Sequence, residues 1–260
     1  MKLVFIGSGN VATVLGKKAR KSGHTILQVI SRNPEHAKEL ATQLDCSYTA
    51  DNSAIDLSAD MYIFSISDKG LSDLKDFTGL SEKFVIHTAG SVPMNVLKDI
   101  SANTGVLYPL QSIRKDMDSN TPIPLLIDAN TAENMVLLKD FANGISEIVE
   151  FATDDDRINI HIGAVFVCNF TNHLYQLAEK YCIETGINFK LLYPLLLETA
   201  QRIKEDSPRI MKTGPAVRKD MVTINRHLGL LSRYPDLHAI YEVLTNSIMH
   251  QEELEDNDIE

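Results

Sequence analysis

The stretch Val4-Phe5-Ile6-Gly7-Ser8-Gly9-Asn10-Val11-Ala12 decides the fold. It has the pattern G-x-G-x-x-A and lies between an apolar run and a helical pattern. Gly7 permits a tight strand-to-helix turn, Gly9 lets backbone approach a pyrophosphate, and Ala12 is small enough for the helix to pack on a sheet. Free N–H groups at the helix start would bind the phosphates. The stretch predicts a dinucleotide-binding loop; the alternative is a tight turn without a ligand.

The end of the second predicted strand, residues 25–30, indicates which dinucleotide binds. NAD-binding proteins usually place Asp or Glu there to hold the ribose hydroxyls, but this chain has Ser31-Arg32-Asn33. Arg32 can pair with a 2′-phosphate, and Ser31 can donate a hydrogen bond to it. A charge-assisted bond contributes roughly 1.5–3 kcal/mol, enough to favour NADP over NAD. The sequence predicts NADP(H); the alternative is a surface Arg without this role.

The first half of the chain alternates between short apolar runs and helical patterns. Such alternation predicts an α/β fold with a doubly wound, mostly parallel sheet that has helices on both faces. Strands are expected at residues 2–6, 25–30, 47–50, 61–65, 84–87, 106–110, 124–127 and 147–151. Helices are expected at residues 11–21, 34–44 and 133–141, with a further helical segment between residues 65 and 84.

The pattern changes at Thr153-Asp154-Asp155-Asp156, a strong helix start with a capping hydroxyl and acids in the first turn. Helices are expected over residues 153–185, 189–205, 215–231 and 237–252, the first ended by Gly186 and the third capped by Thr213 or Gly214. No strand is expected after Phe151. The chain is therefore predicted to have a dinucleotide-binding domain, residues 1–152, and an all-helical substrate and dimerisation domain, residues 153–260.

Composition excludes several classes of protein. The chain has 25 Lys and Arg against 35 Asp and Glu, with six of the acids in the last nine residues, so no nucleic-acid partner is expected. Cys46, Cys168 and Cys182 have no CxxC spacing and are typical of reduced cytoplasmic thiols. The apolar run 162–168 is far shorter than the roughly 20 residues of a membrane span. The apolar run that precedes Gly7 is too short for the apolar core of a signal peptide. We expect a cytoplasmic protein with no membrane partner.

Polar residues follow several of the predicted strands. Ligands bind beyond the carboxyl ends of the strands in a doubly wound sheet, so Ser65, Ser67 and His87 are expected to lie near the cofactor. Tyr108 and Gln111 end a further strand and are expected to face the same cleft. The alternative for each is ordinary turn chemistry.

The long predicted helix carries His161, Asn169 and His173, separated by eight and four residues. At 3.6 residues per turn these lie along one polar stripe, and a neutral His is a suitable general acid or base near pH 7. The alternative is a set of core or dimer-interface residues bonded to backbone. No metal site is expected, because no third strong ligand shares the spacing.

The helix expected after Thr213-Gly214-Pro215 also has a polar face. Arg218 could hold a substrate carboxylate with two hydrogen bonds. Asp220 could orient His227 as a base, since seven residues separate them on one face. The alternative is a solvated face of intrahelical ion pairs.

Taken together, residues 7–12, Ser31-Arg32, Ser65-Ile66-Ser67-Asp68 and His87-Thr88-Ala89-Gly90-Ser91 resemble the superfamily of pyrroline-5-carboxylate reductase and 6-phosphogluconate dehydrogenase. The chain is most similar to a branch of bacterial Rossmann-like NADP oxidoreductases, whose second domain has stretches like residues 161–170 and 213–220. The resemblance implies a homodimer formed through the helical domain, with the active site in the interdomain cleft.

Two departures from that superfamily leave the substrate open. Relatives that act on β-hydroxyacids have a Lys four residues before an Asn on the long helix, and here Asn169 matches but the Lys position is Val165. Pyrroline-5-carboxylate reductases have a Ser/Thr-rich loop where this chain has Thr213-Gly214-Pro215. Neither group's substrate can be transferred.

We therefore expect an NADP-dependent oxidoreductase that moves hydride between the nicotinamide and a small polar carbonyl, imine or alcohol. His161 would donate the proton, Asn169 would hold the reacting oxygen or nitrogen, and Arg218 would hold an anionic group. The alternative, favoured by Val165, is a non-catalytic NADP-binding sensor or scaffold. A third option by analogy is reduction by a deazaflavin partner.

Overall fold

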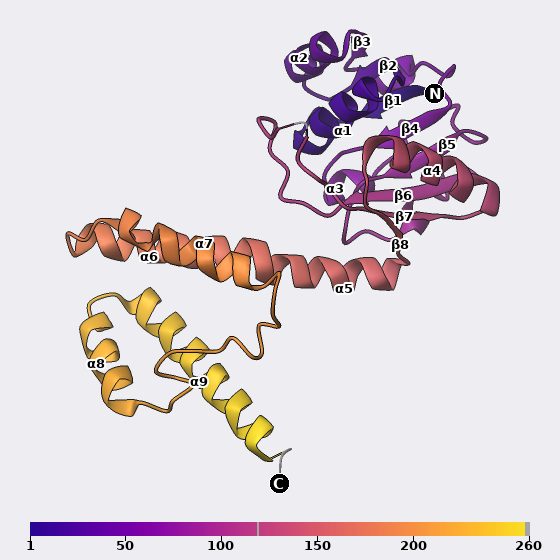
Figure 1. Cartoon of the computed structure of the whole chain (residues 1–260). Helices are drawn as coiled ribbons and strands as arrows, with labels where there is room; N and C mark the ends of the chain where they lie inside the picture. The colour runs from indigo at the N-terminus through magenta and orange to yellow at the C-terminus, as the bar shows by residue number, and fades with distance from the viewer. Residues whose placement is uncertain (119, 258–260) are drawn as a thin grey trace. The chain divides into compact units, whose positions relative to one another are not determined.

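The structure is a computed structural model that describes residues 1–118 and 120–257. It divides into two compact units, Met1–Phe170 and Thr171–Glu260 (Figure 1). The first unit contains the whole sheet and the helix that follows it, and the second is helical. The α/β fold and the helical C-terminal region predicted from the sequence are confirmed.

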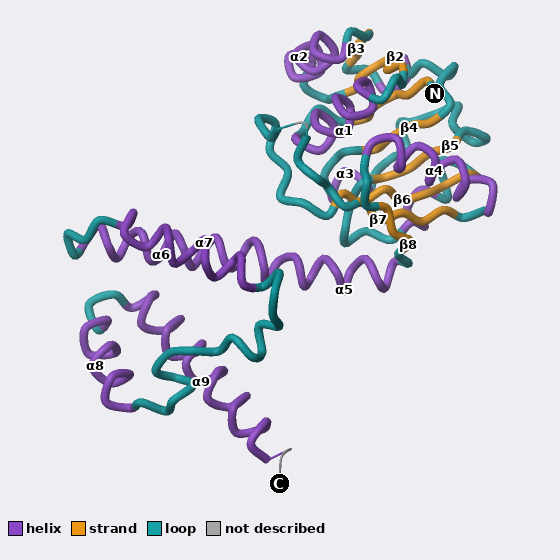
Figure 2. Tube along the Cα trace, viewed as in Figure 1, coloured by secondary structure: helices purple, strands orange, loops and turns teal. Residues whose placement is uncertain are grey.

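The first unit is built on one eight-stranded sheet of order β3-β2-β1-β4-β5-β6-β7-β8 (Figure 2). Every neighbouring pair is parallel except β6 and β7, so the prediction of a mostly parallel sheet is confirmed. The strands are β1 (Lys2–Ile6), β2 (Thr25–Ile30), β3 (Ser47–Thr49), β4 (Met61–Phe64), β5 (Phe84–His87), β6 (Asn103–Pro109), β7 (Leu125–Ala129) and β8 (Val149–Phe151).

The two faces of the sheet are covered differently. Helices α1 (Asn10–Lys21), α2 (Pro34–Leu44) and α4 (Ala132–Ile145) bury one face with Leu and Ala side chains. The other face is covered by the short helix α3 (Asp68–Leu71), the 3-10 helix η2 (Met94–Leu97) and the loops around them. Burial on both faces explains why the strands are almost continuously apolar. The helical segment expected between residues 65 and 84 is only this four-residue α3, because turns occupy the rest.

Helix α5 (Asp154–Ala164) begins with the predicted cap. The Thr153 hydroxyl accepts the Asp156 N–H at 3.2 Å, and the Asp156 carboxylate accepts the Thr153 N–H at 3.1 Å. A π-helical segment, η3 (Val165–Phe170), follows α5 along the chain and precedes α6 (Thr171–Glu184). The sequence predicted one uninterrupted α-helix here, since hydrophobic periodicity does not reveal a π segment.

The second unit contains α6, the 3-10 helix η4 (Phe189–Leu192), α7 (Tyr193–Arg202), α8 (Met221–Leu231) and α9 (Pro235–Asn257). Gly186 has φ +74° and follows α6, as the sequence predicted for its end. The prediction that a helix starts at Pro215 is wrong: Lys219 has φ +52°, and Asp220 caps α8 instead. Residues 258–260 of the acidic tail lie outside the described residues.

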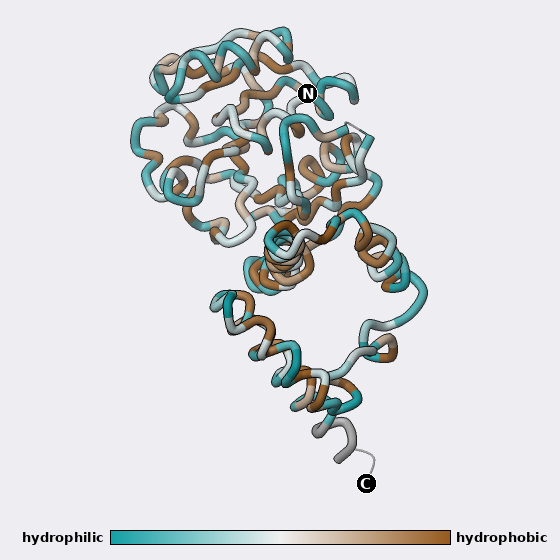
Figure 3. The backbone as a smooth tube through the Cα atoms, turned by 90° about the vertical axis from the view of Figure 1, so that its left-hand side faces the viewer, coloured by the Kyte–Doolittle hydropathy of each residue, from teal (hydrophilic) through white to brown (hydrophobic). Residues whose placement is uncertain are grey.

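Apolar residues recur along the helices of the second unit, as the brown segments in Figure 3 show. Ile183, Leu191, Leu195 and Leu197 are each more than half exposed. None of the described helices combines the length and apolar character needed to cross a lipid bilayer.

Candidate functional site

The turn between β1 and α1 requires glycine at its first position. Gly7 has φ +115°, a backbone conformation that residues with a side chain rarely adopt. A Cβ atom on Gly7 would also lie 2.2 Å from the carbonyl oxygen of Ser65, which follows β4. The loop can therefore bend tightly over the carboxyl end of β4 only with glycine here.

The start of α1 is open to an anion. Gly9 is the N-cap residue and provides no side-chain hydrogen bond, and the first turn contains no acid. The first N–H groups of a helix have no partner inside it, and they carry the positive end of the helix dipole. A Cβ atom placed on Gly9 would meet no protein atom within 4 Å. This space, bordered by unused N–H donors, fits a phosphate group.

The ends of β1 and β2 meet beside this turn. The Ser8 hydroxyl donates to the Ser31 hydroxyl at 2.8 Å, and Arg32 follows as an exposed residue. Asn10 points elsewhere, because its amide donates to the Ile113 carbonyl at 2.9 Å and holds the loop after β6. Of the residues predicted around the cofactor, the structure therefore brings Ser8, Ser31 and Arg32 to the same edge of the sheet.

The residues that follow β4 divide into two roles. Ser65 has a buried hydroxyl with no hydrogen-bond partner in the described part of the chain, next to the Gly7 turn. Ser67 instead caps α3, where its hydroxyl accepts the Gly70 N–H at 3.3 Å. Ser65 is thus the more available of the two for a ligand.

A polar cluster lies on the sheet face that α1, α2 and α4 do not cover. His87 of β5 pairs with Val106 of β6, which pairs with Asp128 of β7, and Tyr108 is two residues beyond Val106. Paired residues, and residues two apart on one strand, point to the same side of a sheet. His87, Tyr108 and Asp128 therefore share one face at the β5–β7 end.

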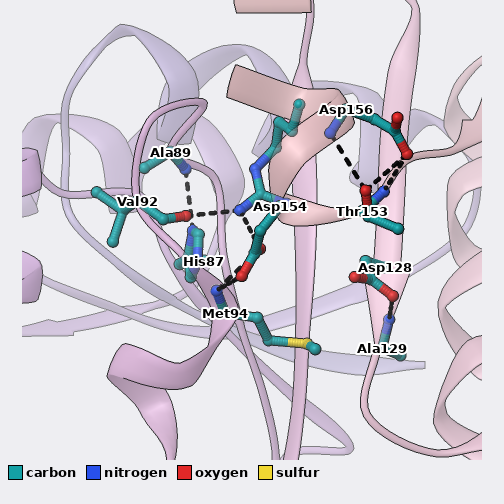
Figure 4. A network of polar contacts seen from close by, with 10 residues as sticks. His87, Ala89, Val92, Met94, Asp128, Ala129, Thr153, Asp154 and Asp156 are labelled. Atoms are coloured by element: carbon teal, nitrogen blue, oxygen red, sulfur yellow. Dashed lines mark hydrogen bonds and ion pairs between the residues drawn. The ribbon is translucent and has the colours of Figure 1, made fainter. Parts of the chain in front are cut away.

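His87 is fully buried in this cluster (Figure 4). Its Nδ1 accepts the Ala89 N–H at 3.2 Å, so the neutral ring carries its hydrogen on Nε2. That Nε2 is buried and lies near the backbone of Pro93. Burial, together with the positive charge of Arg157, lowers the pKa of His87 to about 4, so the ring is neutral near pH 7.

Arg157 of α5 is the largest fully buried side chain of the described residues, with 1% of its surface exposed. Its Nη2 donates to the Val92 carbonyl and to the Asp154 carboxylate, both at 2.6 Å. The same Asp154 carboxylate accepts the Met94 N–H at 3.1 and 3.2 Å. The Arg157–Asp154 pair thus fixes the loop after β5 at two points.

Tyr108 and His161 form a hydrogen-bonded pair beside this loop. The Tyr108 hydroxyl lies 2.9 Å from His161 Nδ1, and the two rings meet edge to face with centroids 5.9 Å apart. Burial raises the pKa of Tyr108. A Cβ atom on Gly90 would lie 2.7 Å from Tyr108 Cζ and 3.0 Å from His161 Nδ1, so the loop packs directly on the pair.

The other residues predicted for the substrate site are exposed. Asn169 is exposed in the π segment, and His173 and Arg218 are exposed residues of the second unit. Of His161, Asn169 and His173, only His161 is partly buried. Asn169 lies eight residues after His161, and the last five of these residues, 165–169, belong to the π segment η3.

Asp220 does not orient His227, and that prediction is wrong. The Asp220 carboxylate accepts hydrogen bonds from the N–H of Thr223 at 3.1 Å and from its hydroxyl at 2.7 Å. His227 Nδ1 instead lies 2.8 Å from the Tyr241 hydroxyl of α9. Asp220 acts as a helix cap because it directly precedes α8. The sequence did not predict this role because it placed the helix start at Pro215.

Sequence reasoning missed Arg157 and recognised Asp154 only as part of a helix start. One feature of the sequence could have identified Arg157. A positive charge near the start of a helix interacts unfavourably with the helix dipole, which indicates that Arg157 has a partner elsewhere. Among the described residues, no group of three His, Cys, Asp or Glu side chains could hold a metal ion.

Comparison with known proteins places this geometry in context. Residues 2–90 match the family model of coenzyme F420-dependent NADP oxidoreductases, and residues 123–248 match a domain of unknown function, DUF2520. No curated protein matches the sequence.

A candidate NADP oxidoreductase from Bacteroides fragilis is 37% identical, covering 96% of this chain and 98% of that one, with a TM-score of 0.89. A Streptococcus pyogenes 1-pyrroline-5-carboxylate reductase is 15% identical over 96% of this chain and 98% of that one (TM-score 0.62). A Myxococcus stipitatus imine reductase, solved with NADP+, is 14% identical over 96% and 93% (TM-score 0.67). The last two show a shared fold.

Proposed function

The chain belongs to the NADP oxidoreductase family of the Bacteroides fragilis protein, and from this premise we propose that it transfers hydride between NADP(H) and a small polar carbonyl, imine or alcohol. The observation that carries the proposal is the uncapped, acid-free start of α1 behind a turn that only glycine can form. The bound nicotinamide supplies the hydride chemistry, and the protein supplies position and electrostatics.

The residues present fit NADP(H). The first N–H groups of α1 would hold the pyrophosphate. Ser65, whose backbone contacts the Gly7 turn, has a hydroxyl with no hydrogen-bond partner in the described part of the chain. Ser31 and Arg32 would hold the 2′-phosphate, because Arg gives charge-assisted hydrogen bonds to phosphate.

The choice of dinucleotide can be tested by fluorescence titration with NADPH and NADH. We expect Arg32→Ala to weaken NADPH binding about tenfold to a hundredfold, equivalent to roughly 1.5–3 kcal/mol, and to leave NADH binding unchanged. Equal affinity of the wild type for both dinucleotides, or a preference for NADH that survives the substitution, would refute the NADP assignment.

Within the proposal, the Tyr108–His161 pair is the proton donor. The proton-donating form of His161 is the imidazolium, whose Nδ1–H donates to the Tyr108 hydroxyl oxygen and so orients the ring. Nε2 then gives its proton to the substrate, which leaves a neutral His161 with its remaining hydrogen on Nδ1. A positioned acid of this kind contributes about 10²- to 10⁴-fold to a rate. Val165 occupies the position at which relatives carry a Lys, and the pair would replace that acid.

Asn169 and Arg218 remain proposed substrate contacts. Asn169 follows His161 by about two helical turns, so Asn169 would bind a part of the substrate away from the proton donor. Arg218, exposed on the second unit, would bind an anionic group.

The turnover experiment is stopped-flow oxidation of bound NADPH against a panel of ketones and cyclic imines. We expect at least one compound to oxidise the cofactor, with turnover by His161→Ala reduced about 100-fold or more. Tight NADPH binding without oxidation by any compound would favour a sensor or scaffold. A loss of less than about threefold in His161→Ala would remove this residue from the mechanism.

A homodimer formed through the helical domain is also part of the proposal. Ile183 and Leu191 of the second unit are 71% and 72% exposed, and monomeric proteins rarely leave clusters of such side chains in water. Sedimentation equilibrium should give twice the chain mass for the wild type and a monomer for Leu191→Glu/Leu195→Glu. A monomeric wild type at micromolar concentration would contradict this.

A further inference from the structure

We infer that Arg157 is a positioning residue for the Tyr108–His161 pair, through the loop that it holds between β5 and η2. This inference rests on the proposed function, because it assigns a task to Arg157 in the reaction proposed for His161. It also makes a structural statement that can be tested without a substrate.

Burying the charged side chain of Arg157 is energetically unfavourable. The side chain is 1% exposed, and its Nε and Nη1 have no partner in the described part of the chain. Buried charges and unpaired donors are unfavourable, so stability alone does not account for an Arg at this position; apolar residues of similar volume often serve as well. The role of Arg157 must therefore follow from the contacts that it makes.

Arg157 and Asp154 hold the loop that follows β5. Nη2 reaches the Val92 carbonyl, and Asp154, which Arg157 neutralises, holds the Met94 N–H. Both contacts attach the loop 88–94 to the first turn of α5. A third contact, from the Ser91 hydroxyl to the Asp68 carboxylate at 2.5 Å, joins this loop to α3.

The loop 88–94 also contacts the Tyr108–His161 pair, the proposed proton donor. Gly90 directly precedes the held residues Ser91, Val92 and Met94. A Cβ atom on Gly90 would lie 2.7 Å from Tyr108 Cζ, which is closer than Cβ atoms approach, and 3.0 Å from His161 Nδ1. Arg157 and His161 are four residues apart, which places them on the same side of α5. Releasing the loop from Arg157 would therefore remove the wall that keeps the Tyr108–His161 hydrogen bond in place.

The experiment follows the His161 Nδ1 signal by ¹⁵N NMR of histidine-labelled full-length protein at fixed pH. Tyr108→Phe removes the hydrogen bond directly and defines the full change in that signal. We expect Gly90→Ala and Arg157→Met/Asp154→Asn to shift the His161 signal most of the way to the Tyr108→Phe value. The double variant removes both charges, so no carboxylate is left unpaired.

Arg114→Met/Asp116→Asn is the matched control, because it removes an exposed Arg–Asp pair outside the cluster. It should leave the His161 signal at the wild-type value. If the Arg157→Met/Asp154→Asn variant does not fold, Arg157→Lys serves instead, because Lys keeps the charge but lacks the planar donor geometry. Thermal unfolding establishes which variants are folded.

A folded Arg157 variant with an unchanged His161 signal would overturn the inference and leave Arg157 a purely structural residue. NADPH titration of the wild type and of the same variants tests the proposed function separately from the role of Arg157. If the wild type does not bind NADPH, the proposed function is refuted, but the NMR result on Arg157 still holds. With a substrate in hand, the Arg157 variants should lose about 10- to 100-fold in kcat with little change in KM, the effect of a displaced catalytic group.

Discussion

A side chain would have different consequences at Gly7 and at Gly9 of the same loop. At Gly7 a methyl group would meet the Ser65 carbonyl at 2.2 Å in a positive-φ backbone, whereas at Gly9 it would enter empty space. We expect Gly7→Ala to lower the free energy of unfolding by about 2–5 kcal/mol, from strain and overlap. Gly9→Ala should cost no more than about 1 kcal/mol, since Gly is only a moderate cap. Urea unfolding checks both, and equal losses would contradict this distinction.

His87 gives stability a pH dependence of known sign. Its pKa is about 4 in the fold and about 6.5 in an unfolded chain, so between these values the unfolded chain binds more protons. The free energy of unfolding therefore falls as the pH falls from about 6.5 to 4, by up to about 3 kcal/mol from this residue.

Urea unfolding of wild type and His87→Asn at pH 7 and pH 5 isolates this contribution, because the other groups cancel in the difference. The wild type should lose more stability than the variant on acidification. The same loss in both proteins would show that His87 does not carry the effect.

Among the helices, the start of α8 can be tested through its N-cap residue, Asp220. Asp220 accepts the Thr223 N–H, so Asp220→Ala should reduce the free energy of unfolding by about 0.5–2 kcal/mol, the usual value of a helix cap. Thr213→Ala, at the site the sequence favoured as a cap, should stay within about 0.5 kcal/mol of wild type. Thermal unfolding of both variants decides; a larger loss for Thr213→Ala would contradict the observed helix start.

The elements that could be predicted are those with a repeating or sharply local signal. Residues 2–12 combine an apolar strand, two spaced glycines and a helix, so a single stretch specified the turn and its neighbours. The start of α8 was predicted at the wrong residue because Gly214 and Pro215 are as favourable a local helix start as Asp220. The backbone of Lys219, at φ +52°, is not helical, so α8 begins only after it. Propensity alone could not decide between the two starts.

The candidate site was predictable only in part for a similar reason. His161 stood out as an ionisable group, but its partner Tyr108 comes from β6, 53 residues away, and depends on strand order. Arg157 acquires its role from a loop carbonyl 65 residues earlier in the chain. Sequence spacing along one helix carries no information about such contacts.

At the scale of the whole molecule, cofactor binding should stabilise the fold. A ligand that binds only the folded state raises the free energy of unfolding by about 2.7 kcal/mol at 100 times its Kd. We expect NADPH to raise the melting temperature of the wild type in a concentration-dependent way, with a smaller shift for Arg32→Ala. Identical shifts from NADPH and NADH would contradict the proposed selectivity.

The most direct test of the central claim, that the start of α1 holds a dinucleotide pyrophosphate, is an equilibrium titration of wild type and Gly9→Ala with NADPH. The added methyl group would occupy the space left for phosphate without touching the protein. We expect saturable binding by the wild type and at least about tenfold weaker binding by the folded variant, equivalent to about 1.4 kcal/mol. Failure of the wild type to bind NADPH, or equal affinity in the two proteins, would contradict it.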